Sequence, residues 1–270
     1  MARMDRLLPP FNADPAARGV VRMAGGVLHL LRLGALMVVL SLSPSSYLQP
    51  ARRQAVMQQL VRATLPLLTW FLVLSALVSL VLIRIVVATA ASYGLSQYAI
   101  EVLVRTLVLE LIPLYAALFV ALRHAMPQAQ QVRALLARRR QAASAPDALA
   151  TVALALFPRA LASGFAVLLL AGLAGVTALV LSYLSIYGFS PWGLPAYTHA
   201  VGGIFSPAVG LIFALKTGLF ALAVAVVPLA AAARPDAAGR FRRQSDMASF
   251  ARLFSALLLI EIGSLLGNYA

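Results

Sequence analysis

The chain has 270 residues, of which 62% are hydrophobic and only 11% are charged, and its formal net charge is +14. Globular domains average about 45–50% apolar and about 25% charged residues, so this composition excludes an ordinary soluble domain. The basic residues cluster in short segments between apolar runs, which is the positive-inside pattern of an inner-membrane protein and does not indicate nucleic-acid binding. Cysteine is absent, which excludes disulfides, thiolate metal sites and a cysteine nucleophile.

Residues 1–62 are expected to form a cytoplasmic tail followed by interfacial helices. Residues 1–19 are polar and contain proline, whereas residues 50–62 are basic and amphipathic. Between them lies an apolar stretch, residues 20–43, that is interrupted by Arg22, His29 and Arg32. A helix lying in the membrane interface would let these side chains reach water. We therefore favour an interfacial elbow helix, although the length also permits a short spanning helix.

Five later stretches have the length and composition of membrane-spanning helices, which need about 17–25 apolar residues. They are residues 63–89, 102–122, 160–186, 208–233 and 253–269. The second stretch contains Arg105, Glu110 and Pro113, so it is the least lipid-like of the five. The sequence thus predicts an all-α polytopic membrane protein, in which an elbow helix precedes a five-helix transmembrane domain at residues 63–270.

The connecting segments predict the orientation of the chain in the membrane. Residues 123–159 and 234–252 are rich in arginine, whereas residues 90–101 and 187–207 contain no Arg or Lys and carry tyrosines and a tryptophan. Basic loops stay in the cytoplasm and aromatic residues collect at the membrane interfaces. Five spans then place the N-terminus in the cytoplasm and the C-terminus outside.

Three charged residues stand alone inside the apolar runs: Glu110, Lys216 and Glu261. At about 1.5 Å per helical residue, each lies roughly 12–14 Å deep in a hydrocarbon core of about 30 Å. A charge at this depth costs at least about 2.5–3.5 kcal/mol unless it faces a partner or a wet cavity. We therefore expect Lys216 to lie between the two carboxylates. Two interpretations remain open: a structural ion pair that orients the helices, or a polar patch beneath a substrate cavity or in a gating contact.

Other candidate residues carry weaker signals. Glu101 and Arg105 have the favourable i, i+4 order of a surface pair, and Arg84 either snorkels outward or attracts an anionic headgroup. The arginines after the second span are the positive-inside signal and a candidate docking loop for a cytoplasmic partner: Arg123, Arg133, Arg138, Arg139 and Arg140. No catalytic triad, metal site or phosphate-binding loop is recognisable, so we expect neither enzymatic activity nor a cofactor in this chain.

Three segments resemble the MlaE/YrbE permeases, the membrane subunits of MCE-type ABC lipid transporters. LVLELIPLYAALFVALR (residues 107–123) is similar to the family's "RELGP…LLVAGR" segment, with Glu110, Pro113 and Arg123 on the family's Glu, Pro and Arg. LIFALKTGLFAL (residues 211–222) is similar to "LIKxxxFG", and FPRALASG (residues 157–164) to "PRLLA". Lys216 falls on the family lysine, and Glu261 takes the place of a family Asp.

The chain also departs from the family pattern in three places. Leu109 stands where the family has an arginine, and MPQAQQVRALLARRR (residues 126–140) replaces the family's small-residue coupling segment. The family's "TTR"-type segment before the last helix is not recognisable in RRQSDMASFAR (residues 242–252).

This resemblance implies a homodimeric permease subunit, bound to cytoplasmic ATPase subunits and to a periplasmic MCE protein. It would move phospholipid or a similar lipid between the inner and outer membranes. ATP would be hydrolysed in the partner subunit, because this chain lacks a nucleotide motif. Two alternatives come from other classes: an ion-coupled secondary transporter or channel that uses Glu110 and Glu261 as proton carriers, and a non-transporting membrane scaffold.

Overall fold

The computed structural model describes residues 32, 34–39, 41, 50–142, 148–233 and 246–269. Throughout these ranges the chain is helical apart from short connections, and the described residues contain no strand. The long helices are α2 (Pro50–Ser92), α5 (Met126–Ala142), α6 (Ala148–Tyr187), α8 (Pro207–Ala233) and α9 (Asp246–Tyr269). The shorter ones are η2 (Ser96–Tyr98), α3 (Ala99–Leu103), η3 (Val104–Leu111), α4 (Ile112–Val120), η4 (Ala121–Ala125), η5 (Pro191–Gly193) and α7 (Leu194–Ile204).

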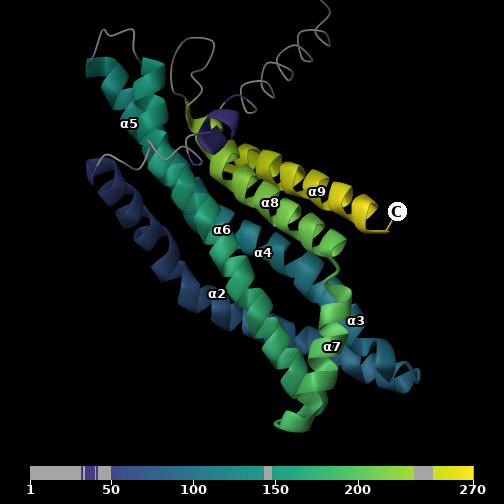
Figure 1. Ribbon diagram of the computed structural model, residues 1–270. Helices are drawn as coiled ribbons and strands as arrows, with labels where there is room; N and C mark the ends of the chain where they lie inside the picture. Colours follow the sequence, from purple (N-terminus) through teal and green to yellow (C-terminus); the bar gives the residue numbers. More distant parts are fainter. Residues whose placement is uncertain are drawn as a thin grey trace, which may run out of the picture.

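The five predicted spans are confirmed as helices that are long and apolar enough to cross a membrane. In the described part of the chain these stretches are Val56–Ser92, Ser96–Arg138, Leu156–Tyr187, Pro207–Ala232 and Met247–Gly267. The chain is therefore a multi-pass membrane protein. Figure 1 shows α5 and the start of α6 at one end of the bundle, and the connection between α6 and α7 at the other.

Two helices are longer than the sequence predicted. Helix α2 has 43 residues and passes without a break through residue 62, where we placed the boundary of the transmembrane domain. Helix α6 has 40 residues and begins before the predicted start of the third span at residue 160. At about 1.5 Å per residue each is roughly 60 Å long, twice the thickness of the hydrocarbon core. Both helices are therefore long enough to reach beyond the core.

We predicted a loop between the second and third spans, and this prediction is wrong for residues 123–142. These residues are helical: η4 and α5 continue directly from the second span, and α6 begins at Ala148. The segment is rich in Ala, Leu, Gln and Arg, which are strong helix formers, and Pro127 lies just after the π-helical segment η4, where the regular hydrogen-bond pattern is already interrupted. A second correction concerns the predicted outer loop at residues 187–207, which contains the helix α7.

Most of the predicted elbow helix lies outside the described residues, as do Arg22 and His29. Residues 34–39 are helical and pack on the bundle, since Met37 is buried in a cluster with residues of α6 and α8. This contact does not distinguish an interfacial helix from a spanning one. The elbow helix therefore stays a prediction.

The main core surrounds the second span. Leu107, Ile112, Ala116 and Val120 are buried there, and α2, α6, α8 and α9 pack around them. At one end, α7 is fixed to α6 because the Tyr197 hydroxyl donates to the Leu179 carbonyl at 2.8 Å. Burial raises the pKa of Tyr197, so its phenol keeps the proton that this bond requires.

Replacing Gly164 by leucine is expected to lower the thermal stability of the protein in detergent. A Cβ atom at residue 164 would already contact the Ala221 carbonyl oxygen at 3.5 Å and the Ala225 Cβ at 3.8 Å, so a branched side chain there crowds the contact between α6 and α8. Such overpacking costs about 1–3 kcal/mol. Gly172→Leu, on the same helix, is the control, because a Cβ atom there meets nothing within 4 Å. Equal melting temperatures of the two variants would contradict this account of the packing.

Candidate functional site

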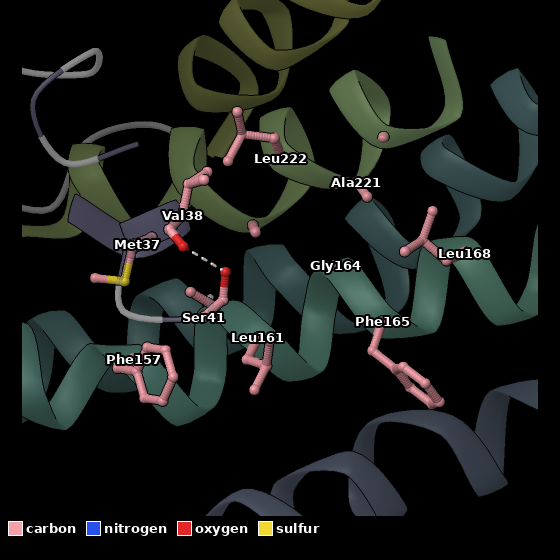
Figure 2. A pocket seen from close by; sticks show the side chains of 13 residues that line it. Met37, Val38, Ser41, Phe157, Leu161, Gly164, Phe165, Leu168, Ala221 and Leu222 are labelled. Carbon is pink, nitrogen blue, oxygen red and sulfur yellow. Dashed lines mark hydrogen bonds between the residues drawn. The ribbon is translucent and has the colours of Figure 1, made fainter. Parts of the chain in front are cut away.

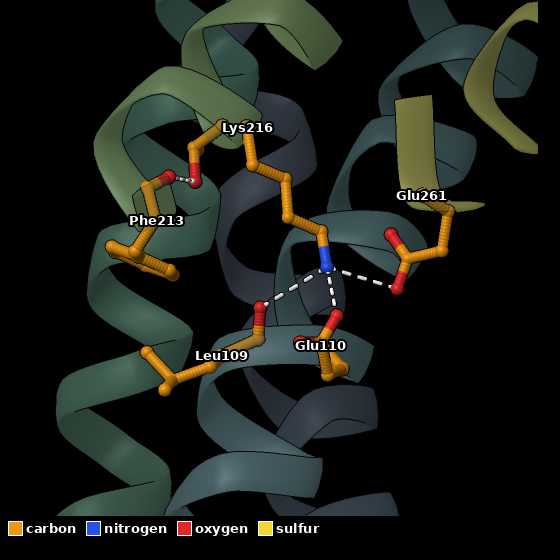
Figure 3. Close-up of polar contacts among 6 residues, drawn as sticks. Leu109, Glu110, Phe213, Lys216 and Glu261 are labelled. Carbon is orange, nitrogen blue, oxygen red and sulfur yellow. Dashed lines mark hydrogen bonds and ion pairs between the residues drawn. The ribbon is translucent and has the colours of Figure 1, made fainter. Parts of the chain in front are cut away.

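The three intramembrane charges meet in the structure. Lys216 on α8 extends between two neighbouring elements, and its ammonium contacts the Glu110 carboxylate on η3 and Glu261 Oε1 on α9, the latter at 2.9 Å (Figure 3). Its third contact is the Leu109 carbonyl oxygen, at 3.3 Å. An ammonium carries three N–H donors, so these contacts use its full donor capacity. We call this group (Lys216, Glu110, Glu261 and the Leu109 carbonyl) the lysine cluster.

The local backbone explains why the Leu109 carbonyl takes part. In a regular α-helix this carbonyl accepts the N–H of residue 113, but Pro113 has none. The preceding segment Val104–Leu111 also has π-helical geometry, in which the Ile112 N–H bonds to the Leu107 carbonyl five residues back. Such π segments are rare and frequently occur at functional sites. Pro113, predicted as a secondary site residue, thus acts by leaving a backbone oxygen open to Lys216.

The lysine cluster is buried. The side chain of Lys216 is 1% exposed, and those of Glu110 and Glu261 are 11% and 12% exposed. The ammonium also lies 5.9 Å from the centroid of the Phe220 ring, within the range of a cation–π contact. Breaking a buried pair by removing one partner costs about 3–5 kcal/mol, because the remaining charge stays buried without its counter-charge. The cluster therefore ties α8 to both the second span and α9.

Two buried polar atoms on α9, one of them in the lysine cluster itself, have no hydrogen-bond partner among the described residues. They are Glu261 Oε2 and Ser264 Oγ, which lie one turn apart on α9 and are both buried. Sequence reasoning missed Ser264, since a single serine in an apolar helix carries no distinguishing signal. It also missed the Leu109 carbonyl, which the position of Pro113 four residues later could have indicated.

The other predicted residues lie away from the cluster. Arg105 and Glu101 form the predicted exposed i, i+4 pair at 3.0 Å, and Arg84 is exposed on α2. Of the predicted docking residues, Arg123 and Arg138 are exposed. Arg133 instead turns toward α8 and donates to the Ala231 carbonyl at 2.8 Å. The side chains of Arg139 and Arg140 lie outside the described part of the structure.

An apolar groove of about 230 Å³ lies between α6, α8 and the short helical stretch around Met37 (Figure 2). Gly218, Ala221 and Ala225 of α8 line it. At 3.6 residues per turn these positions lie on the face of α8 opposite Lys216. The groove is thus separate from the lysine cluster. In the described ranges, no group of three or more His, Cys, Asp or Glu side chains could hold a metal ion.

Five helices of membrane-spanning length define a polytopic membrane protein. Its buried ion pairs, centred on Lys216, lie between these helices. Comparison with family models identifies the kind of protein. The model described as Permease MlaE matches residues 56–262, about three quarters of the chain, so the chain belongs to the MlaE permease family. It is thus an ABC-type permease, and the predicted membership is confirmed. A search of curated proteins found no match.

Proposed function

We propose that this chain is the permease subunit of an ABC transporter that moves phospholipid, or a similar lipid, between the inner and outer membranes of a bacterium. Two copies form a homodimer in the inner membrane, bound to cytoplasmic ATPase subunits and to a periplasmic MCE protein. The observation that carries this proposal is the family match over residues 56–262, which reaches into all five spans and includes all three charged members of the lysine cluster.

The cytoplasmic end of the bundle supports an ATPase partner. Helix α5 continues the second span, which is long enough to extend beyond the hydrocarbon core, and Arg123 on η4 and Arg138 on α5 are exposed. Arginine forms bidentate contacts with carboxylates, so these side chains suit an acidic docking surface. We therefore propose the docking role for a helical segment and not for a loop. Arg133 is left out of it, because its guanidinium contacts α8.

In this mechanism the spans of two copies enclose a lipid cavity that opens outward. ATP hydrolysis in the partner moves α5 and the helices packed on it, and this movement compresses the cavity. The lysine cluster joins three of the five spans, and so sets their packing and the polarity beneath the lipid. No chemical step takes place on this chain itself.

The test is purification of the tagged protein in mild detergent, followed by reconstitution with its co-purifying subunits into lipid vesicles. We expect an ATPase subunit to co-purify and to crosslink to α5. Transfer of a labelled phospholipid to an acceptor should require hydrolysable ATP, and a non-hydrolysable analogue is the control. Transfer by this chain alone, driven by a proton gradient without ATP, would instead support the ion-coupled transporter. The two carboxylates of the lysine cluster would then be its proton carriers.

A further inference from the structure

Helix α5 is attached to two other helices by polar contacts. The Arg133 guanidinium donates to the Ala231 carbonyl of α8 at 2.8 Å, and the Ser163 hydroxyl of α6 donates to Gln128 Oε1 of α5 at 3.2 Å. Gln128 and Ser163 are both buried. Helix α5 is therefore not a free extension of the second span, because both its start and its middle are held against the transmembrane helices.

The contact to Ala231 has a specific electrostatic basis. In an α-helix the Ala231 carbonyl would accept the N–H of residue 235, but Pro235 has none. Helices usually end at or before the residue that precedes a proline, so this carbonyl is among the last four of α8. These carbonyls form the negative end of the helix dipole, which favours a cation. The guanidinium thus satisfies an open acceptor and interacts favourably with the dipole, in a half-buried position.

The helical stretch that includes α5 also contacts α8 at a second place, the lysine cluster. The chain from Ala99 to Ala142 runs through α3, η3, α4, η4 and α5 without a gap, so Glu110 and Arg133 belong to one continuous helical stretch. Lys216 and Ala231 both belong to α8. The pair is therefore joined by polar contacts at two places, inside the membrane by Glu110 with Lys216 and at the cytoplasmic end by Arg133 with Ala231. Apolar packing accompanies the second contact, because Val132 of α5 and Leu229 of α8 belong to one buried cluster.

Between the two joints, each helix has a place where it can bend. The second span contains the π-helical segment η4 (Ala121–Ala125), and α8 contains Pro228. Helix kinks occur at π segments and at proline. A displacement of α5 at the cytoplasmic end could thus be lost at these bends unless the ends of the two helices are held together.

We propose that Arg133 is a positioning residue, which fixes the end of α8 to α5 so that a displacement of α5 is transmitted along α8 to Lys216. The source of that displacement, an ATPase bound at α5, rests on the proposed function. The joint itself does not, because it connects two helices of this chain. Loss of the guanidinium should uncouple ATP hydrolysis from lipid movement without releasing the ATPase.

The test compares Arg133→Ala with wild type in the purified complex, and Arg62→Ala serves as the control because it removes an exposed arginine from α2. We expect Arg133→Ala to retain ATP hydrolysis and to move about tenfold less lipid per ATP, the scale of one lost charge-assisted hydrogen bond. Arg133→Lys, which keeps the charge, should recover part of the ratio. Arg62→Ala should keep the wild-type ratio. A wild-type ratio in Arg133→Ala would overturn the proposal.

A second measurement separates this inference from the proposed function. The chain contains no cysteine, so spin labels at Leu135→Cys on α5 and Leu219→Cys on α8 report one distance without background labelling. In this chain alone, Arg133→Ala should broaden the distribution of that distance, whereas Arg62→Ala should not. An unchanged distribution would overturn the joint even if transport is ATP-dependent. If the wild-type complex moves no lipid with ATP, the proposed function fails, and a broadened distribution would still support the joint.

Discussion

Replacing Lys216 by alanine is expected to reduce lipid transport by more than it reduces the amount of protein in the membrane. The change leaves two buried carboxylates without the ammonium that both contact, and breaking a buried pair costs about 3–5 kcal/mol. The helices can partly compensate if a carboxyl group takes up a proton or if they repack, so some folded protein should remain. Lys216→Glu should be worse, since it places three acids together. Membrane abundance and transport activity are measured for each variant.

The triple variant Lys216→Ala/Glu110→Gln/Glu261→Gln is the control for this prediction. It removes every charge of the lysine cluster, so no buried charge is left unpaired and abundance should recover toward wild type. Transport should not recover if the charges themselves take part in it. If Lys216→Ala keeps both abundance and transport at wild-type levels, the cluster is neither a structural nor a functional contact.

The two glutamates are expected to be strongly non-additive. Glu110→Gln leaves Lys216 with Glu261, and Glu261→Gln leaves it with Glu110, so each single variant keeps one ion pair around the ammonium. The double variant leaves the ammonium buried without a carboxylate, which should cost about 3–5 kcal/mol. Residues in one network typically show interaction energies of about 0.5–3 kcal/mol, and this pair should lie at the upper end. Thermal unfolding in detergent measures the stability of each variant.

Glu101→Gln is the matched control for the glutamate variants, because Glu101 forms an exposed pair with Arg105 at 3.0 Å on the same helical stretch. Exposed i, i+4 pairs contribute only about 0.3–0.5 kcal/mol, so this change should have little effect. Additive losses in the Glu110→Gln/Glu261→Gln variant would mean that the two carboxylates do not share Lys216.

Some properties of this protein follow from its sequence alone. The apolar length of each stretch determines the spans, because about 20 apolar residues are needed to cross the hydrocarbon core as a helix. A helix suits this environment because it satisfies its own backbone hydrogen bonds. The depth of Glu110, Lys216 and Glu261 follows from the constant rise per helical residue. Their contact was therefore predictable. A charge inside the membrane is costly without a partner, and these three residues lie at the same depth and can neutralise one another.

The tertiary structure decided how the helices are rotated about their axes and what each side chain meets. Arg133 and Arg138 lie in one basic segment, yet Arg133 reaches the end of α8 while Arg138 stays exposed. The Leu109 carbonyl accepts from Lys216 because Pro113 offers it no N–H and because the packing of α8 brings the lysine to it. Position along a helix is set locally by its rise, whereas its rotation and its neighbours depend on how all the helices pack together. The sequence therefore indicated the depth of the site and its three charged members, whereas packing decided that the Leu109 carbonyl joins them and that Arg133 meets α8.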